Sequence, residues 1–255
     1  MRLFRLTLFT VLRKKTWVIS AFLVLVAPFI LPRISSAEEN PVLIQPALAQ
    51  AAWALAWLSA VIWGFYSASQ VGERLSQTGL GEYFQTLGTS AGRQLFEVWL
   101  ALLSYVAPLG LAAALVCVLA ASPSNAEEKA MWITTNFQYG VLFIAVIAPL
   151  LMMAISVASR FGAVSGFVIT AGLSFYGLYG VGYVKQLISV DGNPFLRTLW
   201  AASPHYHFAD PTERLRYKLG AIEPGEFPLV LAYFLGIALL YAAISRLVFR
   251  VRATV

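Results

Sequence analysis

Six long runs without Asp, Glu, Lys or Arg constrain this 255-residue chain more than any other feature of its sequence. The hydrocarbon core of a bilayer, about 30 Å thick, requires about 20 mostly apolar residues per transmembrane helix. The runs are continuous, whereas the strands of a membrane β-barrel read as ~10-residue alternating segments. The sequence therefore predicts an all-α polytopic membrane protein that forms a single transmembrane domain over residues 1–255. The six predicted spans are 17–32, 47–71, 98–121, 131–158, 161–183 and 227–245.

The distribution of charge predicts how these spans are oriented. Only 12% of the residues are charged, against about 25% in an ordinary soluble domain. If both termini are cytoplasmic, the inner segments hold eleven of the 18 Lys and Arg residues but three of the 12 Asp and Glu residues. Basic residues concentrate on the cytoplasmic side of membrane proteins. We therefore expect both termini to be cytoplasmic, in a multi-pass protein of the inner or plasma membrane.

The N-terminal segment, residues 1–15, interleaves apolar residues with Arg and Lys. This pattern is typical of an interfacial helix on an anionic inner leaflet, although a simple positively charged anchor explains it equally well. The basic start, the apolar run and Ser35-Ser36-Ala37 also resemble a cleaved secretory signal. The length of the basic segment, together with Pro28 and Pro32 in the apolar run, favours a retained first span. Whether this span is ever cleaved stays open.

The sequence contains no motif of a catalytic or cofactor site. No lysine follows a glycine, so the phosphate-binding P-loop is absent. Cys117 is the only cysteine, which excludes an intramolecular disulfide and a thiolate cluster. The stretch around Ser174 lacks the last glycine of the serine-hydrolase motif. We therefore expect a non-enzymatic chain without a cofactor, a metal or a nucleic-acid partner.

The predicted outer loop, residues 184–226, holds both histidines of the chain. His205 and His207, with Asp210 nearby, are candidate metal ligands. A helix-borne pair of ligands prefers a spacing of four, and no fourth ligand is apparent. We therefore interpret both histidines as polar residues of a loop outside the membrane.

Two short helices are expected in the same loop. Asp210 is suited to be an N-cap, because Pro211 follows it at the first helical position, and Gly220 is placed to end a helix over about 211–219. Asn193-Pro194 predicts a second helix that ends before Pro204. We expect these helices to lie on, or dip into, the outer membrane surface.

Residues 72–97, between spans two and three, are polar and amphipathic and lie on the predicted cytoplasmic side. Glycines interrupt the segment at 79, 81, 88 and 92. Because glycine costs a helix about 1 kcal/mol, we expect short helical pieces joined by bends. Such a segment is suited to docking onto a partner.

Two stretches and the general layout together resemble a known family. The first stretch reads Glu73…Gly79-Leu80…Leu87-Gly88-Thr89-Ser90…Arg93, and the second reads Ser203-Pro204-His205…His207-Phe208. With six spans, both ends inside and a basic amphipathic N-terminal helix, the chain resembles type-2 ABC (ATP-binding cassette) transporter permeases. It departs from the family's first motif where Ala91 and Gly92 separate Ser90 from Arg93.

The resemblance implies a function for both stretches. Residues 72–97 would be the coupling helix that sits in a cleft of a separate P-loop ATPase subunit. A second permease chain, identical or different, would complete an exporter in the lipid bilayer, with the glycine-rich span five central to the dimer. The residues implied at the ATPase contact are Glu73, Arg74, Gly79, Glu82 and Arg93. Those implied at the exit of the pathway are Pro204, His205, His207 and Asp210.

Two other classes of function stay open. An ion-coupled secondary transporter normally keeps charged or histidine side chains within its spans, and the six runs contain none, although a sodium site of carbonyls and hydroxyls would not require them. A non-transporting membrane scaffold or assembly subunit is the other alternative. The substrate and the direction of transport stay open as well. Polar and aromatic residues such as Gln138, Tyr139 and Tyr179 are compatible with an amphipathic or lipid-like cargo.

Overall fold

The computed structural model describes residues 2–34, 41–217 and 219–252, and the described residues form helices and no strand. Ser35, Ser36 and Ala37, on which the cleavage interpretation rested, lie outside them. The long helices are α1 (Arg2–Arg13), α2 (Thr16–Leu25), α4 (Pro41–Ser59), α5 (Tyr66–Gln77), α7 (Ala91–Leu119), α8 (Ala126–Phe161), α9 (Ala163–Phe175), α10 (Val181–Asp191), α11 (Pro194–Ala202) and α13 (Phe227–Val248). The short ones are α3 (Ala27–Ile30), α6 (Leu80–Thr86), α12 (Thr212–Arg216), the 3₁₀-helices η1 (Leu31–Ile34) and η5 (Tyr206–Ala209), and the π-helices η3 (Ala60–Phe65) and η4 (Tyr176–Gly180).

Six helical stretches among the described residues are long and apolar enough to cross a membrane, which confirms the predicted number of spans. They are Thr16–Ile34, Ile44–Gln77, Ala91–Leu119, Ala126–Phe161, Ala163–Val190 and Phe227–Val248. The second span joins α4, η3 and α5, and the fifth joins α9, η4 and α10. Both therefore contain a π-helical turn within the span.

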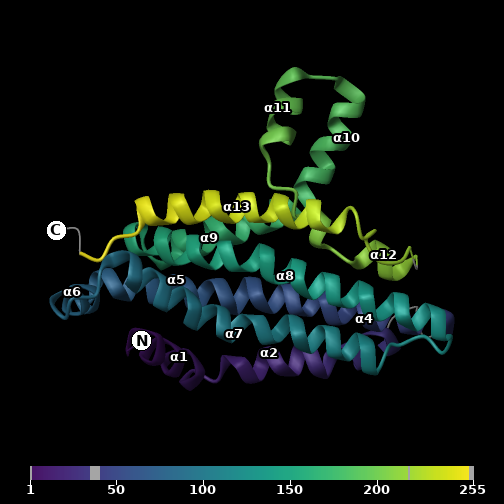
Figure 1. Ribbon diagram of the computed structural model, residues 1–255, viewed down its shortest axis with the longest axis horizontal. Coiled ribbons are helices and arrows are strands. Elements are labelled where there is room, and N and C mark those ends of the chain that lie inside the picture. The colour runs from purple at the N-terminus through teal and green to yellow at the C-terminus, as the bar shows by residue number, and fades with distance from the viewer. Residues whose placement is uncertain (1, 35–40, 218, 253–255) are drawn as a thin grey trace.

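Apart from α10 at the end of the fifth span, the spans run side by side along the long axis of the molecule (Figure 1). The N-terminus, the C-terminus and α6 lie at the same end of this bundle, which we call the terminal end, and α12 lies at the other. An even number of crossings brings both termini to one end. Helix α6, which lies within the predicted segment 72–97, is thus at the same end of the bundle as both termini.

Helix α8 is the centre of the bundle, because α5, α7, α9 and α13 all pack on it. Phe143 of this helix is fully buried, and Tyr139 is almost fully buried. Asn136 is also fully buried, and its Oδ1 accepts a hydrogen bond from Trp53 Nε1 of α4 at 2.9 Å. Unpaired polar groups are costly in hydrocarbon. This bond therefore fixes the second span against the fourth.

The end of the fifth span and the connection that follows it first leave the bundle. Helices α10 and α11 form a hairpin that projects sideways from the other helices (Figure 1). Helix α11 is the helix expected at Asn193-Pro194: the Asn193 side chain accepts a hydrogen bond from Phe195 N at 2.9 Å. The helix expected over 211–219 is α12, and it is shorter than predicted, since it ends at Arg216.

The same connection then enters the bundle at η5. Tyr206 and Ala209 of η5 are 0% and 1% exposed, and the Tyr206 hydroxyl donates to the Tyr241 hydroxyl of α13 at 3.0 Å. This stretch, predicted as a loop outside the membrane, is therefore packed against α13. An aromatic side chain with one hydroxyl can bury its ring and still pair its polar atom, which explains why a polar-looking sequence can enter an apolar bundle.

Candidate functional site

The segment at the terminal end is a short helix held between two glycine turns. Helix α5 continues to Gln77, Gly79 then takes a positive φ of 71°, α6 follows, and Gly88 takes a φ of 80° before α7 begins at Ala91. Left-handed backbone of this kind favours glycine. The expected bends are thus found at Gly79 and Gly88, whereas Gly81 and Gly92 lie inside α6 and α7. Helices α5 and α7 extend into the predicted segment 72–97 and leave residues 78–90 between them.

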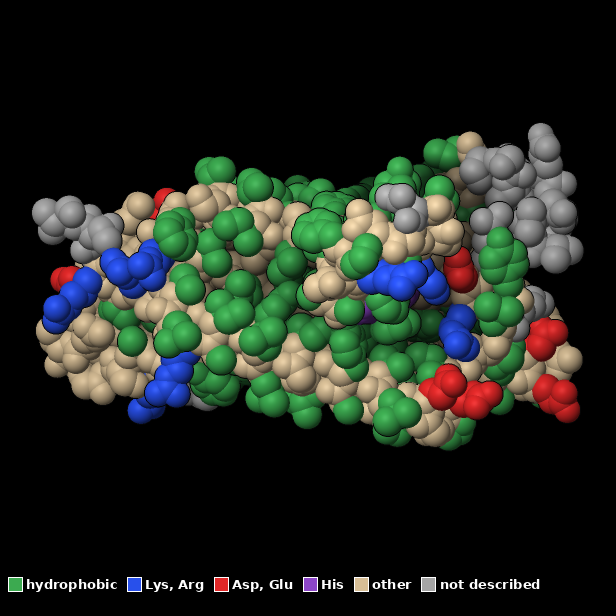
Figure 2. Space-filling view, turned by 90° about the horizontal axis from the view of Figure 1, so that it is seen from above, with side chains coloured by type: hydrophobic (Ala, Val, Ile, Leu, Met, Phe, Trp, Pro, Cys, Tyr) green, Lys and Arg blue, Asp and Glu red, His purple; other side chains and the backbone are tan. Residues whose placement is uncertain are grey.

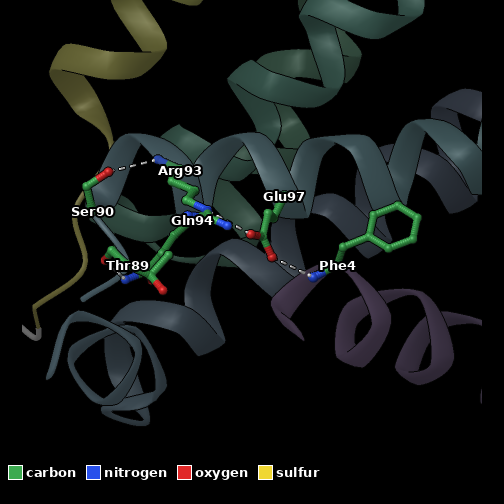
Figure 3. Close-up of polar contacts among 6 residues, drawn as sticks. All are labelled: Phe4, Thr89, Ser90, Arg93, Gln94 and Glu97. Carbon is green, nitrogen blue, oxygen red and sulfur yellow. Dashed lines mark hydrogen bonds and ion pairs between the residues drawn. The ribbon is translucent and has the colours of Figure 1, made fainter. Parts of the chain in front are cut away.

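Gln94 ties this segment to the start of the third span. Its side chain is 0% exposed, and Nε2 donates to Gly81 O at 3.0 Å and to Thr89 O at 3.1 Å. The Ser90 hydroxyl caps α7 by accepting from Arg93 N at 3.4 Å (Figure 3). Because one amide group binds both α6 and the turn after it, α6 is fixed to α7.

Glu97, one turn further along α7, holds the N-terminal helix. It is 3% exposed, its Oε1 accepts from Arg93 Nε at 3.2 Å, and its Oε2 accepts from Phe4 N at 3.2 Å (Figure 3). A carboxylate at a helix N-terminus satisfies free N–H groups and interacts favourably with the helix dipole. Leu3, Thr7 and Val11 of α1 are buried, so α1 packs along the bundle.

Two large apolar side chains are exposed at α6, Tyr83 within the helix and Leu87 at its C-cap. Tyr83 and Leu87 are 59% and 51% exposed, while Phe84 between them is buried. Next to this surface is a cavity of about 340 Å³ between α1, α6 and α7, and its charged lining residues are Arg2, Arg93 and Glu97. The terminal end therefore has an exposed apolar surface beside a polar cavity, and Gln94 fixes this surface to α7.

The five residues expected at a partner contact belong to α5, α6 and α7 and to the turn before α6. Arg74, Glu82 and Arg93 are exposed, and Gly79 and Glu73 are half-buried. The Glu73 carboxylate accepts from Gln77 Nε2 at 3.3 Å and lies beside Gly162, at the turn between α8 and α9. Arg93 pairs with Glu97 within its own helix. Glu82 is the member of the set that shares α6 with the exposed Tyr83.

Gln94 and Glu97 are the residues that sequence reasoning missed. Arg93 and Glu97 have the i, i+4 spacing of a helical ion pair, and that spacing could have indicated their contact. The bonds of Gln94 to Gly81 and of Glu97 to Phe4 join residues 13 and 93 positions apart. No local pattern predicts such pairings.

The second set, Pro204, His205, His207 and Asp210, lies around η5. His205 packs against Trp200, Phe208 and Tyr233, its backbone N donates to Tyr233 Oη at 2.8 Å, and Nε2 lies 3.1 Å from Trp200 O. Asp210 Oδ1 accepts from Thr212 N at 2.9 Å, but the N-cap of α12 is Pro211 and not Asp210 as predicted, because α12 begins one residue later than expected. Within the described part of the chain, no group of three or more His, Cys, Asp or Glu side chains could hold a metal ion.

Both imidazoles favour the neutral form. Burial lowers the pKa of His205 and is the largest effect. The hydrogen bond to Trp200 O raises this pKa, and the nearby charge of Lys185 lowers it further. Burial also lowers the pKa of His207, as do His205 and Lys185, while Asp210 acts in the opposite direction. A charged imidazole is disfavoured in apolar surroundings. At neutral pH these histidines therefore add no positive charge to this region.

Comparisons with known proteins give no identification. A scan against protein-family models finds no family that matches the chain, and a search of curated proteins finds no match.

Replacing Glu97 by alanine is expected to detach α1 and to destabilise the protein. Hydrogen bonds to charged groups each contribute about 1.5–3 kcal/mol, and the variant loses the bonds to Phe4 and Arg93. Thermal unfolding should occur at a lower temperature, and trypsin should cleave faster at Arg5. Glu82→Ala is the matched control, because Glu82 is exposed and such substitutions usually change stability by less than about 0.5 kcal/mol. Equal effects of the two substitutions would contradict the anchoring role.

Proposed function

We propose that this chain is the membrane-spanning permease subunit of an ATP-driven exporter of the type-2 ABC class. It would work as a dimer in the inner or plasma membrane, with both termini cytoplasmic, and would be coupled to a separate P-loop ATPase. The observation that carries the proposal is the surface of α6, where Tyr83 and Leu87 are exposed at the terminal end.

The exposed side chains of α6 are suited to a protein partner. Aromatic and large apolar residues carry much of the binding energy at protein interfaces. The neighbouring cavity, with Arg2 and Arg93 at its edge, is suited to an acidic side chain of that partner. Charged pairs at such an exposed rim guide association more than they strengthen it.

The connections of α6 to the second and third spans support a mechanical role. Its two flanking turns lead directly into α5 and α7, which belong to the second and third spans. Gln94 fixes α6 to α7, and Val251 of the C-terminal segment packs on Gly81 of α6. A displacement of α6 by a closing ATPase would therefore reach both spans and alter access to a path across the membrane. The chain itself lacks a P-loop, so the energy would come from the partner.

Removal of the two exposed side chains tests this function. The double variant Tyr83→Ala/Leu87→Ala, tagged and purified in mild detergent from its native membrane, should recover at least about tenfold less P-loop ATPase than the wild type. The loss of two contacts of about 1 kcal/mol or more has this effect. The matched control is Tyr183→Ala/Leu187→Ala on α10, a pair with the same spacing and similar exposure. Equal recovery from both double variants would argue against docking at α6.

One observation favours the ion-coupled carrier as a second candidate. The second and fifth spans both contain a π-helical turn, η3 and η4, and interrupted helices at corresponding positions of two halves are typical of secondary transporters. A sodium site made of carbonyls and hydroxyls would stabilise the folded chain by mass action. A carrier should therefore unfold several degrees higher in sodium than in potassium chloride. The permease proposal predicts equal unfolding temperatures in both salts.

A further inference from the structure

A second cavity lies between spans four, five and six, away from α6. Its volume is about 650 Å³, and α8, η4, α10, η5, α12 and α13 all contribute to its walls. Figure 2 shows a hollow on the face that bears the α10–α11 hairpin, with histidine at its floor and side chains of both charges at its edge. The volume is within the range of about 300–1,000 Å³ that is typical of small-molecule sites.

Tyr139 of α8 is buried in the wall of this cavity with an unpaired hydroxyl. Its side chain is 2% exposed, and within residues 2–34, 41–217 and 219–252 nothing hydrogen-bonds to the hydroxyl. The hydroxyl itself is not fully buried, and Tyr139 lines the cavity. The neighbouring Gln138 does not supply one, because its amide is bonded in both directions to the backbone of Ile222, at 2.9 and 2.8 Å. A polar group of a ligand in the cavity would satisfy the Tyr139 hydroxyl.

The charged groups of the described lining are mainly acidic. Asp210, Glu213 and Glu226 provide three carboxylates against the single guanidinium of Arg214. Arg214 Nη1 is directed to two carbonyl oxygens, Gly220 O at 3.3 Å and Ala221 O at 3.2 Å. His207 also lines the cavity, where the lowered pKa keeps it neutral at pH 7. Lys185 acts on His207 but is not among the lining residues.

The rest of the lining is apolar. Leu178, Ile222 and Val230 cover one part of the wall, and Tyr179 and Phe208 add aromatic surface. A ligand that matches this cavity has an apolar tail, which gains from burial against these side chains. Its head must carry positive charge to complement the carboxylates and an N–H group to donate to the Tyr139 hydroxyl.

We propose that this cavity binds an amphiphilic cation with an ammonium head and an apolar tail. The ammonium group lies between Tyr139 and the carboxylates of Glu213 and Glu226, and the tail lies along Leu178, Ile222 and Val230. If the ligand is also the transported substrate, that role rests on the proposed function. Binding itself requires neither an ATPase nor transport.

Calorimetric titration of the purified chain in phosphatidylcholine nanodiscs tests the site. The probe is octylamine at pH 7.5, and octanol is the uncharged ligand of the same chain length. Octylamine should bind at least about tenfold more tightly than octanol, after subtraction of binding to empty nanodiscs. The double variant Glu213→Gln/Glu226→Gln should bind octylamine no more tightly than octanol, and Tyr139→Phe should weaken octylamine binding several-fold. Glu223 belongs to the same connection but lies outside the lining, so Glu223→Gln should leave the affinity for octylamine unchanged.

Three outcomes would overturn the proposal: equal affinity for octylamine and octanol, tighter binding of octyl sulfate than of octylamine, or an equal loss in Glu223→Gln and in the double variant. Each is measured on the chain alone. If the ligand does not bind as expected, the proposed docking of an ATPase at α6 still stands. If no ATPase is recovered, the proposed binding of a cation in this cavity still stands.

Discussion

Replacing Gly72 by alanine is expected to destabilise the protein by about 3 kcal/mol or more, the upper range for overpacking in a core. A Cβ atom at this position of α5 would lie 2.2 Å from Ile155 O and 3.0 Å from Ile155 Cα of α8. Because these are backbone atoms, no side-chain rotation can relieve the clash. The two helices would have to separate along one of the most extensive contacts of the bundle. The measurement is thermal unfolding in detergent, where the midpoint should fall by many degrees.

Gly140→Ala is the control for this substitution. Gly140 lies in the middle of α8, and nothing lies within 4 Å of a Cβ atom placed there. Alanine is the better helix former by about 1 kcal/mol, so this variant should be as stable as the wild type or slightly more so. A Gly72→Ala protein that unfolds at the temperature of Gly140→Ala would show that α5 and α8 are not so closely packed.

Replacing Gly177 by alanine is expected to expel η5 from the bundle. A Cβ atom there would lie 2.3 Å from the ring of Tyr206 and 2.8 Å from Pro204 O. Tyr206 would then lose its fully buried position and its bond to Tyr241, and loss of a buried aromatic side chain costs about 3–5 kcal/mol. Proteolysis of the 203–210 stretch should become much faster, and octylamine binding should weaken, because His207, Phe208 and Asp210 line the cavity.

The matched control for Gly177 is in the same span. Gly172 of α9 has nothing within 4 Å of an added Cβ atom, so Gly172→Ala should leave proteolysis and binding unchanged. If Gly177→Ala behaved in the same way, Tyr206 would not be packed against η4, and the connection between spans five and six would lie outside the bundle after all.

The sequence predicted the parts of this fold that depend on local patterns. Six apolar runs indicated six helices, since apolar length alone decides whether a helix can cross a bilayer. Gly79 and Gly88 indicated the turns around α6, because each adopts a backbone conformation that favours glycine. Asn193 indicated the start of α11 through its ability to cap a helix.

Features that depend on distant pairing could not be predicted in this way. The burial of Tyr206 requires a glycine at 177 and a hydroxyl at 241, and neither residue is unusual in its own helix. Glu97 follows a polar stretch at the start of a span, and only the position of α1 shows what it binds. The acidic cavity joins residues from spans four, five and six.

The central claim is that α6 docks into an ATPase, and photocrosslinking from this helix tests it most directly. Tyr83 is replaced by a photoreactive phenylalanine in the full chain, native membranes are irradiated, and the crosslinked products are identified by mass spectrometry. The same replacement of Tyr183 is the control. The proposed function predicts that the probe at position 83, and not the probe at 183, is joined to a protein that contains a P-loop. If position 83 yields only lipid adducts, or the same products as position 183, the claim that this chain is an ABC permease is contradicted.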